Sequence, residues 1–406
     1  MNIENNEISF DFLRNSKQVR LSQIASPNAR IGWQNLRRSE FKDEGDVYII
    51  TGTDFINGTV NLKTCQYVDT PRYEMDDKIK IHENDILITK DGTIGKVAIV
   101  KGLDKKATLN AGVFVLNNIS KDVDRMYLYH YLRSPNLLNF INSQSTGGTI
   151  LHLNQSVLLN FPVQLPELHI QQKIAEFFTA LDEKLSIVSN VCLSFERLYK
   201  STISDLLAQR IRFKSNDQTY YPEWNHCRLG DIFKVSMCKR VFKDETSAEG
   251  DVPFYKIGTL GKEPDSFISK ELFEKYVEKY SYPKKGDTLI SCSGTVGKCV
   301  VFDGKASYYQ DSNIIWLEPI NTDYSYDKRF LTLVLENYNW GDLSASTIKR
   351  IYSSDILEKV FVEPCIDEQR DIADFAFDLK EKIAICNKKL EALKQLKKAF
   401  MQRMFV

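Results

Sequence analysis

The chain has 406 residues, of which 43% are hydrophobic and 27% charged, and its 54 basic and 54 acidic residues give a formal net charge of zero. This length exceeds what one hydrophobic core ordinarily holds, so two to four compact units are expected. The charge balance disfavours a protein that coats nucleic acid non-specifically, although local basic patches could still contact DNA. No run reaches the roughly 18 apolar residues that a membrane helix needs, and the polar N-terminus does not resemble a secretory signal.

The eight cysteines are scattered without a CxxC pair, and the five histidines show no metal-ligand spacing. This pattern predicts neither a zinc site nor a disulfide framework, and it is typical of a reducing compartment. We therefore expect a cytoplasmic protein without a bound metal.

Short runs rich in Val, Ile, Tyr and Phe, broken by Gly, Asp and Asn, predict strands in each half of the chain. In chain order these strands are 47–50, 85–89, 97–100 and 113–116, then 288–291, 299–302 and 314–317.

Each series of strands is followed by one long predicted helix, over about residues 169–211 and 367–404. Apolar residues recur along both helices in steps of four and three, which is close to the coiled-coil period. Charged residues such as Lys397 fill the other faces. Phe177 and Leu198 are apolar residues off the main stripe, and we expect both to be exposed on the helices. The main stripes include Ile174, Phe178, Leu181, Cys192 and Tyr199 in the first helix, and Ile372, Leu379, Cys386, Leu390 and Phe400 in the second.

The chain repeats itself. Residues 84–88 and 91–97 align without a gap with residues 286–290 and 293–299. A repeat this long makes each copy a domain rather than a solenoid unit. Further landmarks recur in the same order: Arg20-Leu21 with Arg228-Leu229, Thr149-Ile150 with Thr347-Ile348, Pro166 and Gln171 with Pro364 and Gln369, and Ile174-Ala175 with Ile372-Ala373.

Two isolated helices of this length would leave long apolar stripes in water, so we expect them to pack on each other. A pseudo-two-fold axis relating two domain-plus-helix copies would make the helices antiparallel, as a spacer of roughly 60 Å. The predicted fold class is therefore α+β, with two similar mixed α/β domains separated by an antiparallel coiled coil. The predicted boundaries are 1–165 and 214–363 for the globular parts, and 166–213 and 364–406 for the helices. The alternative is that the helices form the core of a helical bundle.

The duplicated order of these motifs resembles the specificity (S) subunit of type I restriction-modification systems. The motifs that carry the resemblance are 85–88 with 92–96, 286–290 with 294–298, the segments from Pro166 and Pro364 into the helices, and 390–398. The resemblance covers nearly the whole chain, from about Val19 to its end.

This resemblance implies that the globular parts are target recognition domains, each reading one half of a bipartite site in double-stranded DNA. The helices would set the spacing and bind two methyltransferase (M) subunits that methylate adenine, and restriction (R) subunits would join them. S-adenosylmethionine, ATP and Mg²⁺ are expected in those partners, and no cofactor in this chain. The chain itself would be non-catalytic.

Three kinds of segment are candidate DNA contacts, because bases are read by donors, acceptors and apolar groups while cations hold the backbone. The first is the basic loop 28–38 and its counterpart 239–243; the second is the glycine turn 91–96 and its copy 293–298; the third is the pair of stretches 145–152 and 344–352. The alternative for the loops is an ordinary solvated surface. For the turns it is a purely structural role, since a tight hairpin needs glycine for folding alone. The candidate residues are Arg30, Trp33, Gln34, Asn35, Arg37, Arg38, Lys96, Lys239, Arg240, Lys243, Lys298, Lys349 and Arg350.

The sequence lacks the motifs of a catalyst. No Asn/Asp-Pro-Pro-Tyr/Phe methyltransferase motif and no GxGxxG loop occurs, and residues 251–254 approximate the former only poorly. We therefore predict no catalytic residue. The main alternative is an orphan homologue that binds methyltransferase subunits as a scaffold without reading DNA; a stand-alone enzyme is a third.

Overall fold

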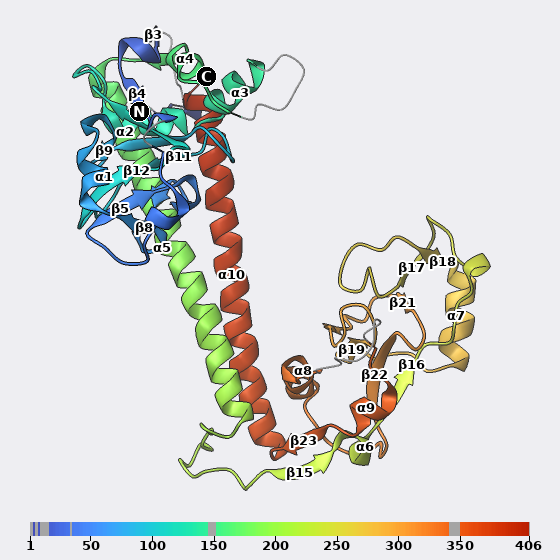
Figure 1. Ribbon diagram of the computed structural model, residues 1–406. Helices are drawn as coiled ribbons and strands as arrows, with labels where there is room; N and C mark the ends of the chain where they lie inside the picture. Colours follow the sequence, from blue (N-terminus) through green and yellow to red (C-terminus); the bar gives the residue numbers. More distant parts are fainter. Residues whose placement is uncertain are drawn as a thin grey trace. The chain divides into compact units, whose positions relative to one another are not determined.

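The computed structural model describes residues 16–32, 35–144, 152–340 and 350–405, and the backbone of 3–4 and 7–8 (Figure 1). The chain forms two compact units: the first unit comprises residues 1–190 and 387–406, and the second unit residues 191–386. The long helices α5 (Leu168–Leu207) and α10 (Ile366–Met404) each contribute one part to each unit. Both helices end within four residues of their predicted limits.

The first unit is built on a six-stranded sheet and a four-stranded sheet. The six-stranded sheet has the order β4 (Ser26–Asn28), β13 (Val113–Asn117), β10 (Ile86–Thr89), β11 (Val97–Ile99), β7 (Thr59–Val60) and β6 (Phe55–Ile56). The four-stranded sheet has the order β8 (Gln66–Val68), β5 (Val47–Ile50), β12 (Lys106–Leu109) and β9 (Lys80–Ile81). Two further antiparallel pairs join β3 (Lys17–Arg20) to β14 (Pro162–Leu165) and β1 (Ile3–Glu4) to β2 (Glu7–Ile8). The shorter helices are α1 (Thr70–Glu74), α2 (Arg125–Leu132), α3 (Pro135–Ser143) and α4 (Gln155–Leu159).

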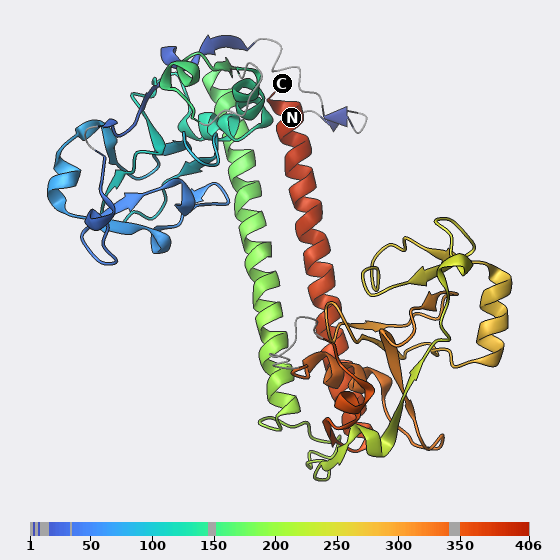
Figure 2. The same cartoon turned by 45° about the vertical axis from the view of Figure 1, so that its right-hand side comes forward.

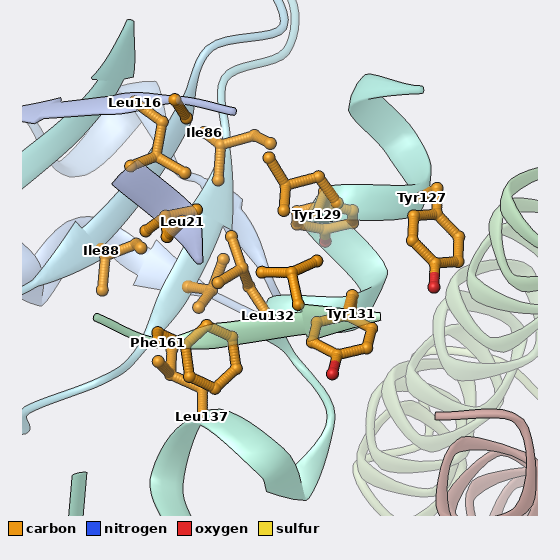
Figure 3. Close-up of a cluster of buried hydrophobic side chains, with 14 of the residues drawn as sticks. Leu21, Ile86, Ile88, Leu116, Tyr127, Tyr129, Tyr131, Leu132, Leu137 and Phe161 are labelled. Atoms are coloured by element: carbon orange, nitrogen blue, oxygen red, sulfur yellow. The ribbon is translucent and has the colours of Figure 1, made fainter. Parts of the chain in front are cut away.

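The central strands of the first unit are buried on both faces, which explains their continuous apolar runs. Because successive side chains of a strand point to opposite faces, Ile86 and Ile88 join the core that contains α2, whereas Leu87 joins the core under the four-stranded sheet. Figure 3 shows the first of these cores, with Tyr127 and Tyr131 of α2 on the side of the long helices. Both tyrosine rings pack edge-on against Phe405, the residue that follows α10.

The second unit repeats this plan with fewer strands. Its sheets have the orders β16 (Phe233–Met237), β22 (Ile314–Pro319), β19 (Thr288–Ser291) and β20 (Cys299–Val301), and β18 (Phe267–Ile268), β17 (Val252–Tyr255) and β21 (Tyr308–Tyr309). An antiparallel pair joins β15 (Asn225–Arg228) to β23 (Val360–Glu363). The shorter helices are α6 (Leu229–Ile232), α7 (Lys270–Lys279), α8 (Lys328–Asn337) and α9 (Ser353–Leu357). In both views α7 lies by the smaller sheet, away from α8 and α9 (Figures 1 and 2).

The repeated glutamines explain one landmark of the duplication. Gln171 is buried, donates to Pro166 O over 2.9 Å and accepts from Asp124 N over 2.9 Å. Gln369 makes the same two bonds, to Pro364 O at 2.9 Å and from Asp327 N at 3.0 Å. Each glutamine thus ties the start of a long helix to the N-cap of α2 or α8.

The two long helices pair antiparallel within each unit, as predicted. In the first unit the Phe177 and Phe400 rings lie 5.0 Å apart, and Asp182, further along α5, contacts Lys397, which comes earlier in α10. In the second unit Cys192 is bonded to Cys386, and Tyr199, further along α5, has Lys380 5.6 Å from its ring centre. Residue numbers therefore fall along α10 as they rise along α5. Within the described residues each unit also packs its own sheets beside these helices, so the fold is mixed α/β and not a helical bundle.

Three expectations about the helices are wrong. Cys192 and Cys386 form a disulfide, with their Cα atoms 5.7 Å apart, because the paired apolar stripes place them opposite each other. Lys397 is only 8% exposed, since α10 turns it onto the carboxylate of Asp182. Phe177 is half-buried against Phe400 rather than solvent-facing, whereas Leu198 is 49% exposed as expected.

Candidate nucleic-acid interface

The glycine turns of the two units have the same construction. Gly92 and Gly95 take φ angles of 70° and 77°, and Gly294 and Gly297 take 68° and 75°. These left-handed conformations are open to glycine at little steric cost. In both copies the hydroxyl of the residue that ends the preceding strand accepts from the backbone N–H of the turn lysine, at 2.9 and 3.0 Å. The turns therefore have a structural role, in agreement with the alternative given for these segments.

The turn lysines point back to the protein backbone. Lys96 Nζ donates to Phe55 O at 3.1 Å, and Lys298 Nζ donates to the carbonyl of Leu260. Each ammonium thus joins its turn to a neighbouring segment of the same unit, strand β6 in the first unit and the turn at Leu260 in the second. A phosphate contact by either lysine stays a prediction.

The structure brings the glycine turns together with the stretches that precede α4 and α9. Asp91 pairs with His152 through an isolated β-bridge, and Ser293 pairs with Arg350 in the same way. The Asp91 carboxylate also contacts His152 Nδ1. Of the third candidate group, residues 145–151 and 344–349, including Lys349, lie outside the described residues.

The first basic loop divides into a buried and an exposed part. Asn35, Arg37 and Arg38 are exposed, and the last begins the short 3₁₀ helix Arg38–Glu40. Glu40 accepts from the backbone N–H of Arg37 at 2.7 Å and pairs with Arg72 at 2.5 Å, which fixes this turn on the surface. Trp33 and Gln34 lie outside the described residues.

Arg30 is a correction to the predicted contacts. It is 2% exposed, and it donates from Nε to Leu109 O at 2.8 Å and from Nη2 to Thr108 Oγ1 at 3.1 Å. Burial is the largest influence on its pKa, which lies below the usual arginine value. A guanidinium enclosed in this way cannot reach a DNA groove, because its donors serve the end of β12 instead.

In the second unit the basic segment stays on the surface. Lys239, Arg240 and Lys243 are exposed, and the Lys239 ammonium lies 5.4 Å from the centre of the Tyr280 ring. Arg240 Nε donates to Asp311 Oδ2 at 2.8 Å. Candidates from different segments thus meet at the loop that joins β21 to β22.

The loop 311–313 is the part of the site that sequence reasoning missed. Arg350 Nη2 lies 3.4 Å from both the carbonyl and the hydroxyl oxygens of Ser312, and Ser293 Oγ donates to Asn313 Oδ1 at 2.8 Å. Asp-Ser-Asn after a strand signals only a turn. Its contact with two arginines is a consequence of the tertiary fold.

The site holds no recognisable catalytic chemistry among the described residues. No three metal-ligating side chains group together there. The buried thiols are poor nucleophiles, since burial raises the pKa of Cys238 to about 12 and that of Cys292 to about 11. Within the same ranges, no helix is long and apolar enough to cross a membrane.

The two units therefore repeat one arrangement, in which a glycine turn is bridged to the segment before α4 or α9. The family of this protein follows from comparison with known proteins: the chain belongs to the type I restriction modification DNA specificity domain family, whose sequence profile matches residues 15–191 and 221–395. The resemblance drawn from the repeated motifs is confirmed, as is the predicted fold class of two similar mixed α/β domains with long helices.

Curated relatives agree with this assignment. A putative type I restriction enzyme specificity subunit of Haemophilus influenzae is 34% identical over 72% of this chain and 74% of its own length. The MjaVIII specificity subunit of Methanocaldococcus jannaschii is 24% identical over 80% of this chain and 79% of its own.

Solved structures show the same fold. The type I restriction-modification S subunit from M. genitalium superimposes with a TM-score of 0.60 at 18% identity, covering 100% of this chain and 98% of the other. A chain from a structure on complex assembly and conformational transition of the type I R-M system gives a TM-score of 0.56 at 19% identity, covering 96% and 97%. This chain is thus a type I specificity subunit, and such subunits are non-catalytic, which confirms the prediction that it is not an enzyme.

Proposed function

We propose that this chain reads a bipartite DNA site, one half with each globular unit, and thereby directs adenine methylation and restriction by partner subunits. The observation that carries the proposal is the duplication of one loop cluster: a glycine turn bridged to the segment before α4 or α9. Two similar DNA-binding units in one chain are what recognition of a site with two separate halves requires. The sequences around the turns differ, as is expected if the halves differ.

Local charge supports the proposal despite the net charge of zero. Exposed Arg37 and Arg38 in the first unit, and Lys239 and Arg240 in the second, supply cations of the kind that position a protein on phosphates. Replacing all four by alanine should weaken DNA binding and make it less dependent on salt. A scaffold that does not read DNA would bind methyltransferase subunits and DNA equally well before and after the replacement.

Methylation sequencing tests the proposal directly. A host carrying the operon should show adenine methylation at a split motif, and deletion of this gene should abolish that motif. If every methylated motif survived the deletion, the proposal would be wrong. Restoring the gene on a plasmid is the matched control, because it should bring the same motif back.

We further propose that the long helices bind two methyltransferase subunits. Exposed apolar side chains support this, since they would otherwise remain in water. On α5 these are Ile187 at 63%, Val191 at 42%, Leu193 at 46% and Leu198 at 49% exposed, and on α10 Ile385 at 60% and Leu396 at 46%. Changing Ile187 and Ile385 to Glu should reduce co-purification of the methyltransferase subunit without affecting folding. In this proposal S-adenosylmethionine, ATP and Mg²⁺ are bound by the M and R partners and not by this chain.

A further inference from the structure

Arg240 and Asp311 form an ion pair with unequal exposure. Arg240 Nε lies 2.8 Å from Asp311 Oδ2, and the arginine side chain is 61% exposed whereas the aspartate is 19% exposed. The carboxylate therefore stands behind the guanidinium, on its protein side. For the described residues, Arg240 has no other hydrogen-bond or ion-pair partner.

This pairing leaves one edge of the guanidinium available. An arginine has five N–H donors in a rigid plane, and the Nε donor is already committed to Asp311. The terminal nitrogens can still donate two parallel bonds, which is the arrangement that matches O6 and N7 of guanine in the major groove. Resting on the function proposed above, we propose that Arg240 reads a guanine in the half-site of the second unit, and that Asp311 is the positioning residue that orients it.

The loop that carries Asp311 is held from its other side. Ser312 takes a positive φ of 47°, which is uncommon for a residue other than glycine. Arg350 contacts Ser312 at 3.4 Å, and Ser293 of the glycine turn donates to Asn313 at 2.8 Å. The loop is thus tied to two neighbouring segments, and a tied loop can fix the carboxylate that Arg240 grips.

The first unit lacks this device at the matching position. Asn110 N donates to Ile50 O and Gln310 N donates to Tyr255 O, both at 2.9 Å, so residues 110 and 310 correspond. The next residue is Ala111 in the first unit and Asp311 in the second. Only the second unit has a carboxylate at this position to orient an arginine, so the proposed contact concerns the half-site read by the second unit.

A phosphate contact is the competing role for Arg240. The guanidinium would then contribute affinity without sequence information, and its replacement would weaken binding to all sequences alike. Asp311 would oppose such a role, because a carboxylate beside the arginine repels a phosphate and reduces the local positive charge. The pair favours a neutral, directional acceptor such as a base edge.

Methylation sequencing of the complete system with Arg240→Lys and Asp311→Asn tests the inference. Lysine keeps the charge but loses the rigid fork. We expect Arg240→Lys to lower the preference for guanine at one position of one half-site by about 10-fold. Asp311→Asn should relax the same position by a smaller factor. The matched controls are Lys305→Ala and Asp303→Asn, which break an exposed ion pair of 3.3 Å in the same unit and should leave every position unchanged.

Binding of the assembled methyltransferase complex to DNA with 7-deazaguanine at that position gives a second readout. Removing N7 should reduce wild-type affinity by about 10-fold, and Arg240→Lys should be nearly indifferent to the change. An unchanged motif in the Arg240→Lys variant, or an equal loss of affinity for all sequences, would overturn the inference while leaving a split-site reader intact. A wild-type system without any methylated split motif would instead refute the proposed function. Since Asp311→Asn changes no volume, it separates loss of orientation from loss of folding.

Discussion

Asp182 should be a sensitive position of the first unit, because it lies between two cations from different helices. Arg133 Nη1, at the end of α2, lies 2.7 Å from Asp182, and Lys397 Nζ of α10 contacts its other oxygen. Burial alone would raise the pKa of Asp182, but Arg133 and Lys397 outweigh it and keep that pKa below its usual value. Burial and the neighbouring Arg133 lower the pKa of Lys397.

Replacing Asp182 by alanine leaves Arg133 and Lys397 without their shared counter-charge. Removing one member of a fully buried pair costs about 3–5 kcal/mol, whereas exposed pairs contribute about 1 kcal/mol or less. Counting side-chain atoms alone, Asp182 is 28% exposed, Arg133 17% and Lys397 11%, so the pairs resemble buried pairs more than exposed ones. We expect a loss of about 2–3 kcal/mol in the free energy of unfolding of the first unit.

This loss can be measured by urea denaturation that is monitored through hydrogen exchange in α2 and in the Lys397 segment of α10. Glu183→Ala, on the next and exposed residue, should change stability by less than about 0.5 kcal/mol. Lys397→Met keeps the Asp182–Arg133 pair and should cost less than about 1 kcal/mol. The double variant Asp182→Ala with Lys397→Met should be more stable than Asp182→Ala alone, because it leaves one unpaired buried cation instead of two. The reasoning fails if Asp182→Ala matches wild type, or if Lys397→Met is equally damaging.

Three further predictions concern buried groups. Burial lowers the pKa of His130 to about 3, so the unfolded chain binds a proton on this residue at higher pH than the folded chain does. The free energy of unfolding should therefore fall by about 1.4 kcal/mol per pH unit from about pH 6 toward 4. His130→Asn should flatten that slope in urea titrations at a series of pH values. Mass spectrometry of non-reduced digests should recover Cys192 linked to Cys386, and Cys192→Ser should free the partner for alkylation and lower stability by about 2–4 kcal/mol; an unlinked digest would contradict the pairing. Gln369→Ala removes both bonds of a side chain that is 1% exposed, so we expect about 2–4 kcal/mol of destabilisation by thermal melting, with Gln172→Ala, on an exposed glutamine of α5, as a near-neutral comparison.

Much of the architecture could be predicted because its causes are local. The apolar run 86–89 follows from strand burial, and the stripe through Phe178 and Leu379 follows from helical periodicity; both are readable without knowledge of distant residues. The duplication added the expectation that the long helices pair. It also pointed to Gln171 and Gln369, whose repeated contacts the structure then explained.

Contact partners far apart in the sequence could not be predicted in this way. Nothing local distinguishes buried Arg30 from exposed Arg37, since both stand in one polar, basic loop. The same holds for Asp311, which reads as an ordinary turn residue until Arg240, 71 positions away, is placed beside it.

Seven of the strands, the limits of both long helices and the family could be predicted from the chain alone, because hydrophobic period and duplicated order are properties of the chain. Only the tertiary structure decided which charged groups are enclosed and which face water. Whether Lys397 lies against Asp182, or Cys192 meets Cys386, depends on which residues a partner helix brings opposite. These pairings result from packing between segments that are remote in sequence, so they cannot be predicted from the residue pattern of one segment.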